Sequence, residues 1–281
     1  RKAPVIFWRV AVAMKRRPAG SSADANPTVK KRPASSAGKL TANDAAVCKG
    51  STSLPHAVVI SLARRSDRWE ECQARLKALA DDISFERMYA VDGVAGTDIP
   101  TSNVTLRWST ANNWRYVTKA FEGGEECGYE VVDLALTAGE RGCAASHIAA
   151  WQRCANESKA PLLVLEDDAM PLKAFVSRTR QALDELQEAD AHPDLLYLGY
   201  TKAAPWRRRV GKAVCEAEYL WTTVGYIVWP KGAETLLRAL PVDQPVDNFM
   251  AKLTSTSQLQ AFAVTPPVLK QAKPWNVDND V

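Results

Sequence analysis

The stretch Pro161-Leu-Leu-Val-Leu-Glu-Asp-Asp168 decides the fold class, because it joins an apolar run to a cluster of acids. Every position from Leu162 to Leu165 is apolar, which is typical of a strand buried on both faces of a parallel sheet. The run ends abruptly in Glu166, Asp167 and Asp168. In open α/β sheets, ligands bind beyond the carboxyl ends of the strands. The stretch therefore predicts a buried strand that brings three carboxylates to a ligand-binding edge.

Other segments alternate between strand-like runs and helical spacing. The run Ala57-Val-Val-Ile-Ser-Leu62 has the same buried, β-branched character, and a helical pattern follows it from Trp69 to Ala80. The spacing of Asp67 and Glu70 resembles a capping pair for that helix. Residues 94–138 are irregular and predict loops. Further strands are predicted at 83–91, 194–199, 222–229 and 261–264, and further helices at 173–188 and 231–240.

The segment Thr137-Ala-Gly-Glu140 has the spacing of a capping box and predicts the start of another helix. In this motif the Thr side chain accepts a hydrogen bond from a backbone amide, and the Glu side chain reaches back to the cap. The apolar stripe that follows fits the period of a helix; its residues are Ala144, His147 or Ile148, Trp151 and Cys154.

Strands that alternate with helices predict an α/β domain with a mainly parallel central sheet flanked by helices, over residues 54–281. Residues 1–53 differ in composition, because they are basic and rich in Ala, Ser and Pro. Residues 1–40 hold ten Lys or Arg against one Asp, a charge of +9, whereas residues 41–281 carry −5. Such a segment cannot offset its chain entropy by burying apolar surface, so we expect a flexible stem or tail.

Composition excludes several classes of protein. With 281 residues, 46% of them hydrophobic and 24% charged, the chain is neither a small disulfide scaffold nor a coiled coil nor wholly disordered. No apolar run reaches the ~20 residues of a membrane-spanning helix. The basic tail has no aromatic residue between Lys15 and Lys39, which favours a solvated linker over a nucleic-acid-binding arm. The six cysteines form no C-x-x-C pair, so no structural zinc site is indicated.

The acids at 166–168 have the chemistry of a site for a hard cation. Three adjacent carboxylates repel one another unless solvent or a cation screens them. Oxygen ligands suit Mn²⁺ or Mg²⁺, which also bind phosphate groups of a substrate. If the strand geometry continues, Glu166 and Asp168 project to one side and Asp167 to the other. Glu166 and Asp168 are therefore the predicted metal ligands, and a solvated acidic junction is the alternative.

Six short blocks stand in order along the chain: Val58-Val-Ile-Ser-Leu-Ala-Arg-Arg-Ser-Asp-Arg68, Phe85-Glu-Arg-Met-Tyr-Ala-Val-Asp-Gly93, Gly139-Glu-Arg-Gly-Cys-Ala-Ala-Ser-His147, Leu163-Val-Leu-Glu-Asp-Asp168, Thr223-Val-Gly-Tyr226 and Pro245-Val-Asp247. Together they resemble glycosyltransferase family 25, which includes bacterial lipooligosaccharide galactosyltransferases and collagen hydroxylysine galactosyltransferases. The resemblance extends from about Val58 to the C-terminus. It implies a GT-A-type nucleotide-sugar-binding fold, a UDP-sugar donor, a divalent cation that is usually Mn²⁺, and inversion at the anomeric carbon.

The resemblance also implies roles for particular acids. The triplet Glu166-Asp167-Asp168 takes the place of the family's DxD-like motif, which bridges the metal to the donor diphosphate. Asp280 matches an acid in the family's terminal Ser-Asp-Ile segment, although Asn279 departs from that pattern, and it is a third candidate metal ligand. An inverting transfer needs a general base. Asp247 matches the family's downstream acid and is the predicted base, with Asp243 as its rival.

Donor-binding residues are expected near the ends of the first strands. The turn from Ser61 to Arg68 follows the first strand, and the Arg65 or Arg68 side chain in it can meet phosphate. Asp92 and Gly93 match the family's Val-Asp-Gly segment, which is expected at the ribose. The resemblance also adds Ser146, His147 and Asp167 to the donor site.

The preferred function is therefore a metal-dependent inverting glycosyltransferase that moves a sugar, with galactose preferred, from a UDP-sugar to a hydroxyl group. Two alternatives remain: a metal-dependent phosphohydrolase acting on nucleotides, and a catalytically silent carbohydrate-binding relative. The sequence leaves the acceptor open between a glycan, a lipid-linked saccharide and a protein. It also leaves open whether the chain works in the ER or Golgi lumen or at the cytoplasmic side of a bacterial membrane.

Overall fold

The computed structural model describes residues 53–79, 83–113, 132–157 and 160–272. These residues belong to one of the two units into which the chain divides, Gly50–Val281. Asp280 and almost all of the basic segment 1–53 lie outside the described residues. Among the residues described, no helix is both long and apolar enough to cross a membrane.

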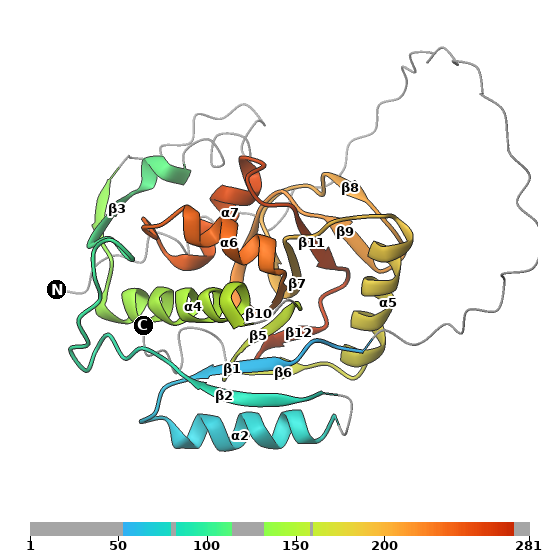
Figure 1. The fold of residues 1–281 in the computed structure, drawn as a ribbon, viewed down its shortest axis with the longest axis horizontal. Helices are drawn as coiled ribbons and strands as arrows, with labels where there is room; N and C mark the ends of the chain where they lie inside the picture. Colours follow the sequence, from blue (N-terminus) through green and yellow to red (C-terminus); the bar gives the residue numbers. More distant parts are fainter. Residues whose placement is uncertain (1–52, 80–82, 114–131, 158–159, 273–281) are drawn as a thin grey trace, which may run out of the picture. The chain divides into compact units, whose positions relative to one another are not determined.

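A central sheet of eight strands forms the frame of the domain, in the order β2-β1-β5-β10-β7-β11-β9-β8 (Figure 1). Its strands are β1 Ala57–Ser61, β2 Phe85–Tyr89, β5 Leu162–Glu166, β7 Leu195–Lys202, β8 Arg208–Arg209, β9 Val214–Glu216, β10 Leu220–Val228 and β11 Ala261–Val264. β1 pairs in parallel with β2 and β5, and β11 pairs in parallel with β7. β10 is antiparallel to both β5 and β7, and β9 is antiparallel to β11 and β8. The α/β class is confirmed, but the sheet is mixed rather than mainly parallel in its pairing.

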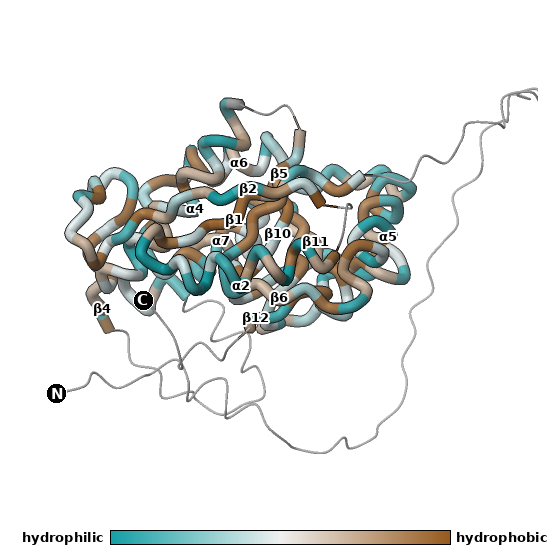
Figure 2. The backbone as a smooth tube through the Cα atoms, turned by 90° about the horizontal axis from the view of Figure 1, so that it is seen from below, coloured by the Kyte–Doolittle hydropathy of each residue, from teal (hydrophilic) through white to brown (hydrophobic). Residues whose placement is uncertain are grey.

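Helices cover both faces of this sheet. On one face α4 (Ala138–Glu157), α6 (Pro230–Arg238) and α7 (Val246–Ser255) bury side chains such as Trp151 and Phe249 against alternate strand residues, including Val164 and Tyr226. On the other face α2 (Ser66–Lys77) and α5 (Phe175–Glu188) pack against the intervening strand residues, including Leu165 and Phe262. Figure 1 shows α2 and α4 on opposite sides of β1 and β2. The strands of this core are coloured hydrophobic in Figure 2.

The long helix before β5 begins as the sequence predicts. The Glu140 amide donates to Thr137 Oγ1 at 3.0 Å, and the Thr137 amide donates to Glu140 Oε2 at 2.7 Å, which completes the capping box. The predicted stripe is buried, since His147, Trp151 and Cys154 are all 0% exposed.

Two local predictions need correction. No side chain caps α2, because Asp67 bonds Arg65 and so does not act as a cap. The predicted loop region contains paired strands, β3 (Arg107–Ser109) and β4 (Asp133–Ala135). A second short pair is β6 (Ala169–Pro171) with β12 (Leu269–Gln271), and β6 follows the acidic triplet directly. These strands are only three residues long, which is too short for an alternating pattern to show in the sequence.

Candidate active site

The acidic triplet lies where three neighbouring strands meet at one edge of the sheet. β5 ends at Glu166, opposite Ile60 at the end of β1. Because β10 runs antiparallel to β5, its first residues reach this same edge. Thr223 Oγ1 donates to Glu166 Oε1 at 2.6 Å. The position of the triplet at a carboxyl edge is therefore as predicted.

An irregularity in β10 connects this edge to Asp247. The register of β10 against β7 shifts between Trp221 and Gly225, and Thr222 has a φ of 74°. A β-branched residue in the left-handed region is strained, and such strain concentrates at functional sites. The Thr222 amide donates to Asp247 Oδ2 at 3.2 Å, while the Asn248 amide donates to Asp247 Oδ1 at 2.7 Å. Both carboxylate oxygens of Asp247 are thereby held in the first turn of α7.

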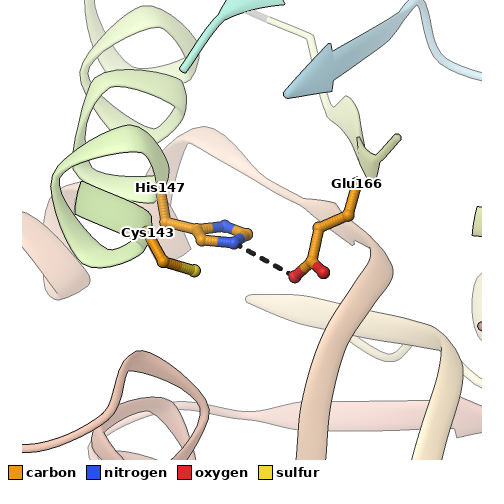
Figure 3. Close-up of side chains that lie close together, drawn as sticks. All are labelled: Cys143, His147 and Glu166. Carbon is orange, nitrogen blue, oxygen red and sulfur yellow. Dashed lines mark ion pairs between the residues drawn. The ribbon is translucent and has the colours of Figure 1, made fainter. Parts of the chain in front are cut away.

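A buried chain of side chains positions His147 beside Glu166. Trp151 Nε1 donates to the Tyr226 hydroxyl at 2.9 Å, and that hydroxyl lies 2.9 Å from His147 Nδ1. His147 Nε2 faces Glu166 Oε1 at 3.4 Å (Figure 3). Cys143 projects from α4 one turn earlier toward the same carboxylate.

Asp167 contacts two arginines of α2. It pairs with the Arg68 guanidinium, and its carbonyl accepts from Arg75 Nη2 at 2.6 Å. Asp168 Oδ2 accepts from Gln271 Nε2 at 3.3 Å and lies 3.9 Å from Arg68 Nη2. Asp168 Oδ1 is buried without a hydrogen-bond partner among the described residues. Arg68 is thus the cation nearest to the triplet in these contacts.

The carboxylates of the site differ in their pKa values. Burial, with repulsion from Glu166, raises the pKa of Asp168 to about 7. Burial also raises the pKa of Asp247, and Glu166 and Glu140 add to that rise. Burial opposes ionisation of Glu166 as well, but the interactions with His147 and Thr223 outweigh it and lower its pKa. Glu166 therefore ionises more readily than an ordinary carboxyl group, whereas Asp168 and Asp247 ionise less readily.

Other predicted donor residues have structural partners in the described chain. Arg65 bonds Asp67 through two nitrogens, at 3.0 and 2.9 Å. The Ser61 hydroxyl accepts from Arg87 Nη2 at 3.2 Å. Ser146 is buried, accepts from the Val91 amide at 2.8 Å and donates to the Gly142 carbonyl at 2.7 Å.

Asp92 and Gly93 shape the loop that packs against the start of α4. Asp92 bonds Arg64 at 2.7 Å and accepts from the backbone amides of Val94 and Ala95. A Cβ atom at Gly93 would lie 1.8 Å from the Ala138 carbonyl oxygen, so only glycine allows this approach. The Gly93 contact places this loop beside the α4 helix that carries His147.

The rival base Asp243 lies outside this cluster of acids. Both of its oxygens are 2.7 Å from Lys252 Nζ. Asp247, in contrast, is close enough to Glu166 for the charge of Glu166 to raise the pKa of Asp247, although burial is the larger cause of that rise. This difference favours Asp247 over Asp243.

Sequence reasoning missed the residues that surround Glu166. Thr223 and Tyr226 were recognised only as part of a block, and Cys143 only as part of the Gly139–His147 block. Tyr226 is fully buried beneath the site, and Cys143 joins His147 and Glu166 in a group whose ligand atoms lie within 4.8 Å of one another. The signal available in the sequence was the i, i+4 spacing of Cys143 and His147 on one helix.

Comparisons with known proteins identify the family. A family model described as glycosyltransferase family 25 (LPS biosynthesis protein) matches residues 54–217, which is more than half of the chain. The chain belongs to glycosyltransferase family 25.

The curated relatives include animal galactosyltransferases. Procollagen galactosyltransferase 1 of Danio rerio is 27% identical over 210 residues, covering 73% of this chain and 32% of that protein. Procollagen galactosyltransferase 2 of Homo sapiens is 32% identical over 202 residues, covering 68% of this chain and 29% of that protein. A glycosyltransferase 25 family member of Drosophila melanogaster is 30% identical over 210 residues, covering 72% and 31%. The chain thus spans about a third of the length of these relatives.

Among solved structures, the crystal structure of UDP-glucose pyrophosphorylase complexed with UDP-glucose aligns with a TM-score of 0.39 and 12% identity. The alignment covers 75% of this chain and 90% of the pyrophosphorylase chain.

Proposed function

We propose that this chain is a metal-dependent inverting glycosyltransferase that moves galactose from UDP-galactose to a hydroxyl group of a glycan, lipid-linked saccharide or protein acceptor. The observation that carries the proposal is the convergence of Glu166, Asp168 and Asp247 at one edge of the sheet in a family 25 chain. Galactose is preferred because relatives at about 30% identity are named galactosyltransferases.

The residues present fit a divalent cation held by Glu166 and Asp168. Asp168 Oδ1 is buried without a hydrogen-bond partner among the described residues. Burial, together with repulsion from Glu166, raises the pKa of the Asp168 carboxyl to about 7. A positive charge at this place would satisfy the orphaned oxygen and favour both ionised carboxylates. When bound, Mn²⁺ or Mg²⁺ supplies charge neutralisation for the diphosphate of the donor. Asp280 remains a further candidate ligand outside the described residues.

Asp247 has the properties of the general base. In an inverting transfer the acceptor oxygen bonds to the anomeric carbon as the bond from that carbon to UDP breaks. The acceptor proton passes to the carboxylate, and the bonding electron pair leaves with UDP. The raised pKa of Asp247 suits this role, because a carboxylate with a higher proton affinity is a stronger base. The two backbone amides that bind its oxygens fix its orientation.

On the donor side, Arg68 is the best-placed cation, because it already contacts Asp167 and Asp168. Its guanidinium would meet a phosphate that approached those acids. Ser61 lies at the end of the neighbouring strand, and Arg65, Asp92, Gly93, Ser146 and His147 complete the proposed donor side.

UDP release from a panel of UDP-sugars tests the proposal. The assay compares Mn²⁺, Mg²⁺ and EDTA, and compares wild type with Asp168→Ala. We expect Mn²⁺-dependent turnover of UDP-galactose that the variant loses. Glu188→Ala is the control, because it removes an exposed carboxylate at the end of α5 on the other face of the sheet.

Other outcomes of this assay would support a different mechanism or function. Turnover that is indifferent to EDTA and to Asp168 would remove the metal mechanism. Release of inorganic phosphate from nucleotides would support the phosphohydrolase instead. Silence with every donor, together with no UDP binding, would support the carbohydrate-binding relative.

A further inference from the structure

Cys143, His147 and Glu166 form a compact group of three different metal-binding side chains. Cys143 and His147 stand four residues apart on α4 and therefore share one face of the helix. Glu166 approaches from the end of β5, so the group joins a helix to the sheet (Figure 3). Their ligand atoms all lie within 4.8 Å of one another. A thiol, an imidazole and a carboxylate are a donor set distinct from the oxygen-only pair of Glu166 and Asp168.

The imidazole of His147 is buried with one nitrogen unused. The ring is 0% exposed, and its Nδ1 is 2.9 Å from the Tyr226 hydroxyl. Nε2 has no hydrogen-bond partner among the described residues and faces Glu166 Oε1. A buried polar atom left unpaired destabilises the folded chain unless a ligand satisfies it. A metal-ligating histidine usually has its other ring nitrogen held by a hydrogen bond, and the contact of Nδ1 with the Tyr226 hydroxyl fits that arrangement.

The spacing of the group fits a tetrahedral ion. Two nitrogen or oxygen ligands at about 2.0–2.1 Å from a tetrahedral metal lie about 3.3 Å apart. The distance from His147 Nε2 to Glu166 Oε1 is 3.4 Å. The thiol sulfur needs to be about 3.5 Å from each of them, and because all the ligand atoms lie within 4.8 Å of one another, a shift of at most about 1.3 Å would achieve this.

We propose that Cys143, His147 and Glu166 form a binding site for Zn²⁺ with a fourth position open to solvent. Zn²⁺ accepts sulfur, nitrogen and carboxylate ligands together, whereas Mn²⁺ and Mg²⁺ prefer oxygen. On binding, the Cys143 S–H bond breaks, a sulfur–zinc bond forms, and the proton is released to solvent. This assignment revises the expectation from cysteine spacing that no thiolate takes part in a metal site.

The site has a consequence that rests on the proposed function. Glu166 belongs both to this group and to the proposed Mn²⁺ site. When Glu166 binds Zn²⁺ beside Cys143, its carboxylate is no longer available to bind the Mn²⁺ that accompanies the donor. Zn²⁺ therefore inhibits UDP release by competing for Glu166.

Cobalt absorption tests the site directly, without donor or acceptor. Co²⁺ added to the metal-free full chain should give intense visible bands of tetrahedral cobalt and a thiolate-to-cobalt charge-transfer band in the near ultraviolet. One equivalent of Zn²⁺ should abolish both. Cys143→Ser should remove the charge-transfer band and weaken Zn²⁺ binding by more than about 100-fold. The matched control is Cys154→Ser, because Cys154 is a buried thiol on the same helix that donates to the Val228 carbonyl.

Several results would overturn the proposal. A wild-type spectrum without the thiolate band excludes Cys143 as a ligand, whether or not any variant folds. A band that persists in Cys143→Ser, or that disappears in Cys154→Ser, assigns the thiolate elsewhere. Glu166→Gln should lower Zn²⁺ affinity at least 10-fold while the thiolate band remains, and unchanged affinity would remove Glu166 from the site.

The inhibitory consequence is measured separately. We expect Zn²⁺ to inhibit Mn²⁺-dependent UDP release in wild type, and the inhibited fraction at a given Zn²⁺ concentration to be smaller in Cys143→Ser relative to its own zinc-free rate. Absence of any UDP release would be a failure of the proposed function and would leave the cobalt result standing. Zn²⁺ binding without inhibition would overturn the competition for Glu166 alone.

Discussion

Asp247 is held by two backbone amides, because the amides of Thr222 and Asn248 each donate to one of its carboxylate oxygens. Asp247→Asn removes the group that accepts the acceptor proton but keeps the size of the side chain. We expect transfer to fall by about 10²–10⁴-fold, the usual contribution of a general base, while UDP binding is retained. Steady-state transfer and calorimetric titration with UDP measure the two effects.

Asp243→Asn is the matched control for this prediction. It removes a carboxylate four residues earlier that is already neutralised by Lys252. We expect its turnover to stay within a few-fold of wild type. Normal turnover in Asp247→Asn, with loss in Asp243→Asn, would exchange the two assignments.

The raised pKa of Asp168 predicts how the stability of the metal-free protein depends on pH. Its pKa is about 7 in the folded protein against an ordinary value of 3.8, so the folded state binds this proton more tightly than the unfolded state. The contribution to stability is complete below about pH 4 and is lost as the pH rises through about 7. Thermal unfolding of wild type and Asp168→Asn between pH 4 and pH 8 should show this fall in wild type and a smaller one in the variant. Parallel profiles would contradict it.

Tyr226 is the residue on which the orientation of His147 depends. Its hydroxyl accepts from Trp151 Nε1 and contacts His147 Nδ1. Tyr226→Phe leaves the buried indole N–H without a partner, which should lower the free energy of unfolding by about 1–3 kcal/mol in urea denaturation. Tyr89→Phe is the control, because Tyr89 is 69% exposed, and it should change stability by less than about 0.5 kcal/mol.

At the scale of elements, helix α4 begins at a capping box and carries two residues of the site. Thr137 and Glu140 cap its first turn, and Cys143 and His147 occupy the next two turns. Thr137→Ala removes the oxygen that accepts from the Glu140 amide, and should destabilise the protein by about 1 kcal/mol. Urea denaturation measures the change. Thr235→Ala in α6 is the control, since Thr235 Oγ1 donates back to the Lys231 carbonyl and caps no amide; an equal loss in both variants would argue against the capping box.

Elements with a strong local pattern were predicted well from the sequence. The α4 helix has both a capping box and a 3.6-residue stripe, and β5 has an unbroken apolar run before Glu166. The helix α7 was missed, because six of its first eight residues are buried and a helix that is apolar on several sides shows no clear stripe. The acids of the site followed from the position of β5, and Asp247 from a resemblance.

Two features of the site that the sequence did not predict depend on contacts between distant segments. Thr222 adopts its left-handed conformation within an irregular part of β10 that is defined only against β7. Likewise the group of Cys143, His147 and Glu166 requires α4 to pack across the end of β5. Spacing within one segment carries no information on such contacts. Sequence reasoning therefore gave Glu166 and His147 as separate candidates but did not bring Cys143 to them.

At the scale of the whole molecule, strand direction is what the sequence could not supply. The apolar pattern from Thr222 to Val228 is the same whether its strand runs parallel or antiparallel to its neighbours. In the structure β10 stands between β5 and β7 and opposes both. This single reversal brings the start of β10 to the carboxyl edge, where Thr223 reaches Glu166. The mixed sheet is thus directly responsible for the composition of the site.

At this scale, the net positive charge of the chain resides in residues 1–52, and this leads to a prediction about that segment. Removing them takes away eleven basic and two acidic residues and changes the net charge from +4 to −5. The described core begins at Leu54, which packs against the buried cluster on the α2 and α5 face. We therefore expect the shortened chain to unfold within about 2 °C of the full chain and to release UDP at the same rate, because burial rather than net charge determines stability here.

Binding to nucleic acid provides the second measurement on this segment. A basic arm that neutralised phosphates would bind DNA or RNA with an affinity that falls steeply as salt increases. We expect no gel shift by either chain at physiological salt, because Lys15 to Lys39 contains no aromatic residue to stack on bases. A shift seen with the full chain and lost on deletion would make the segment a nucleic-acid-binding arm. Loss of UDP release on deletion would instead make residues 1–52 part of the catalytic unit, and the boundary at residues 53–54 would be wrong.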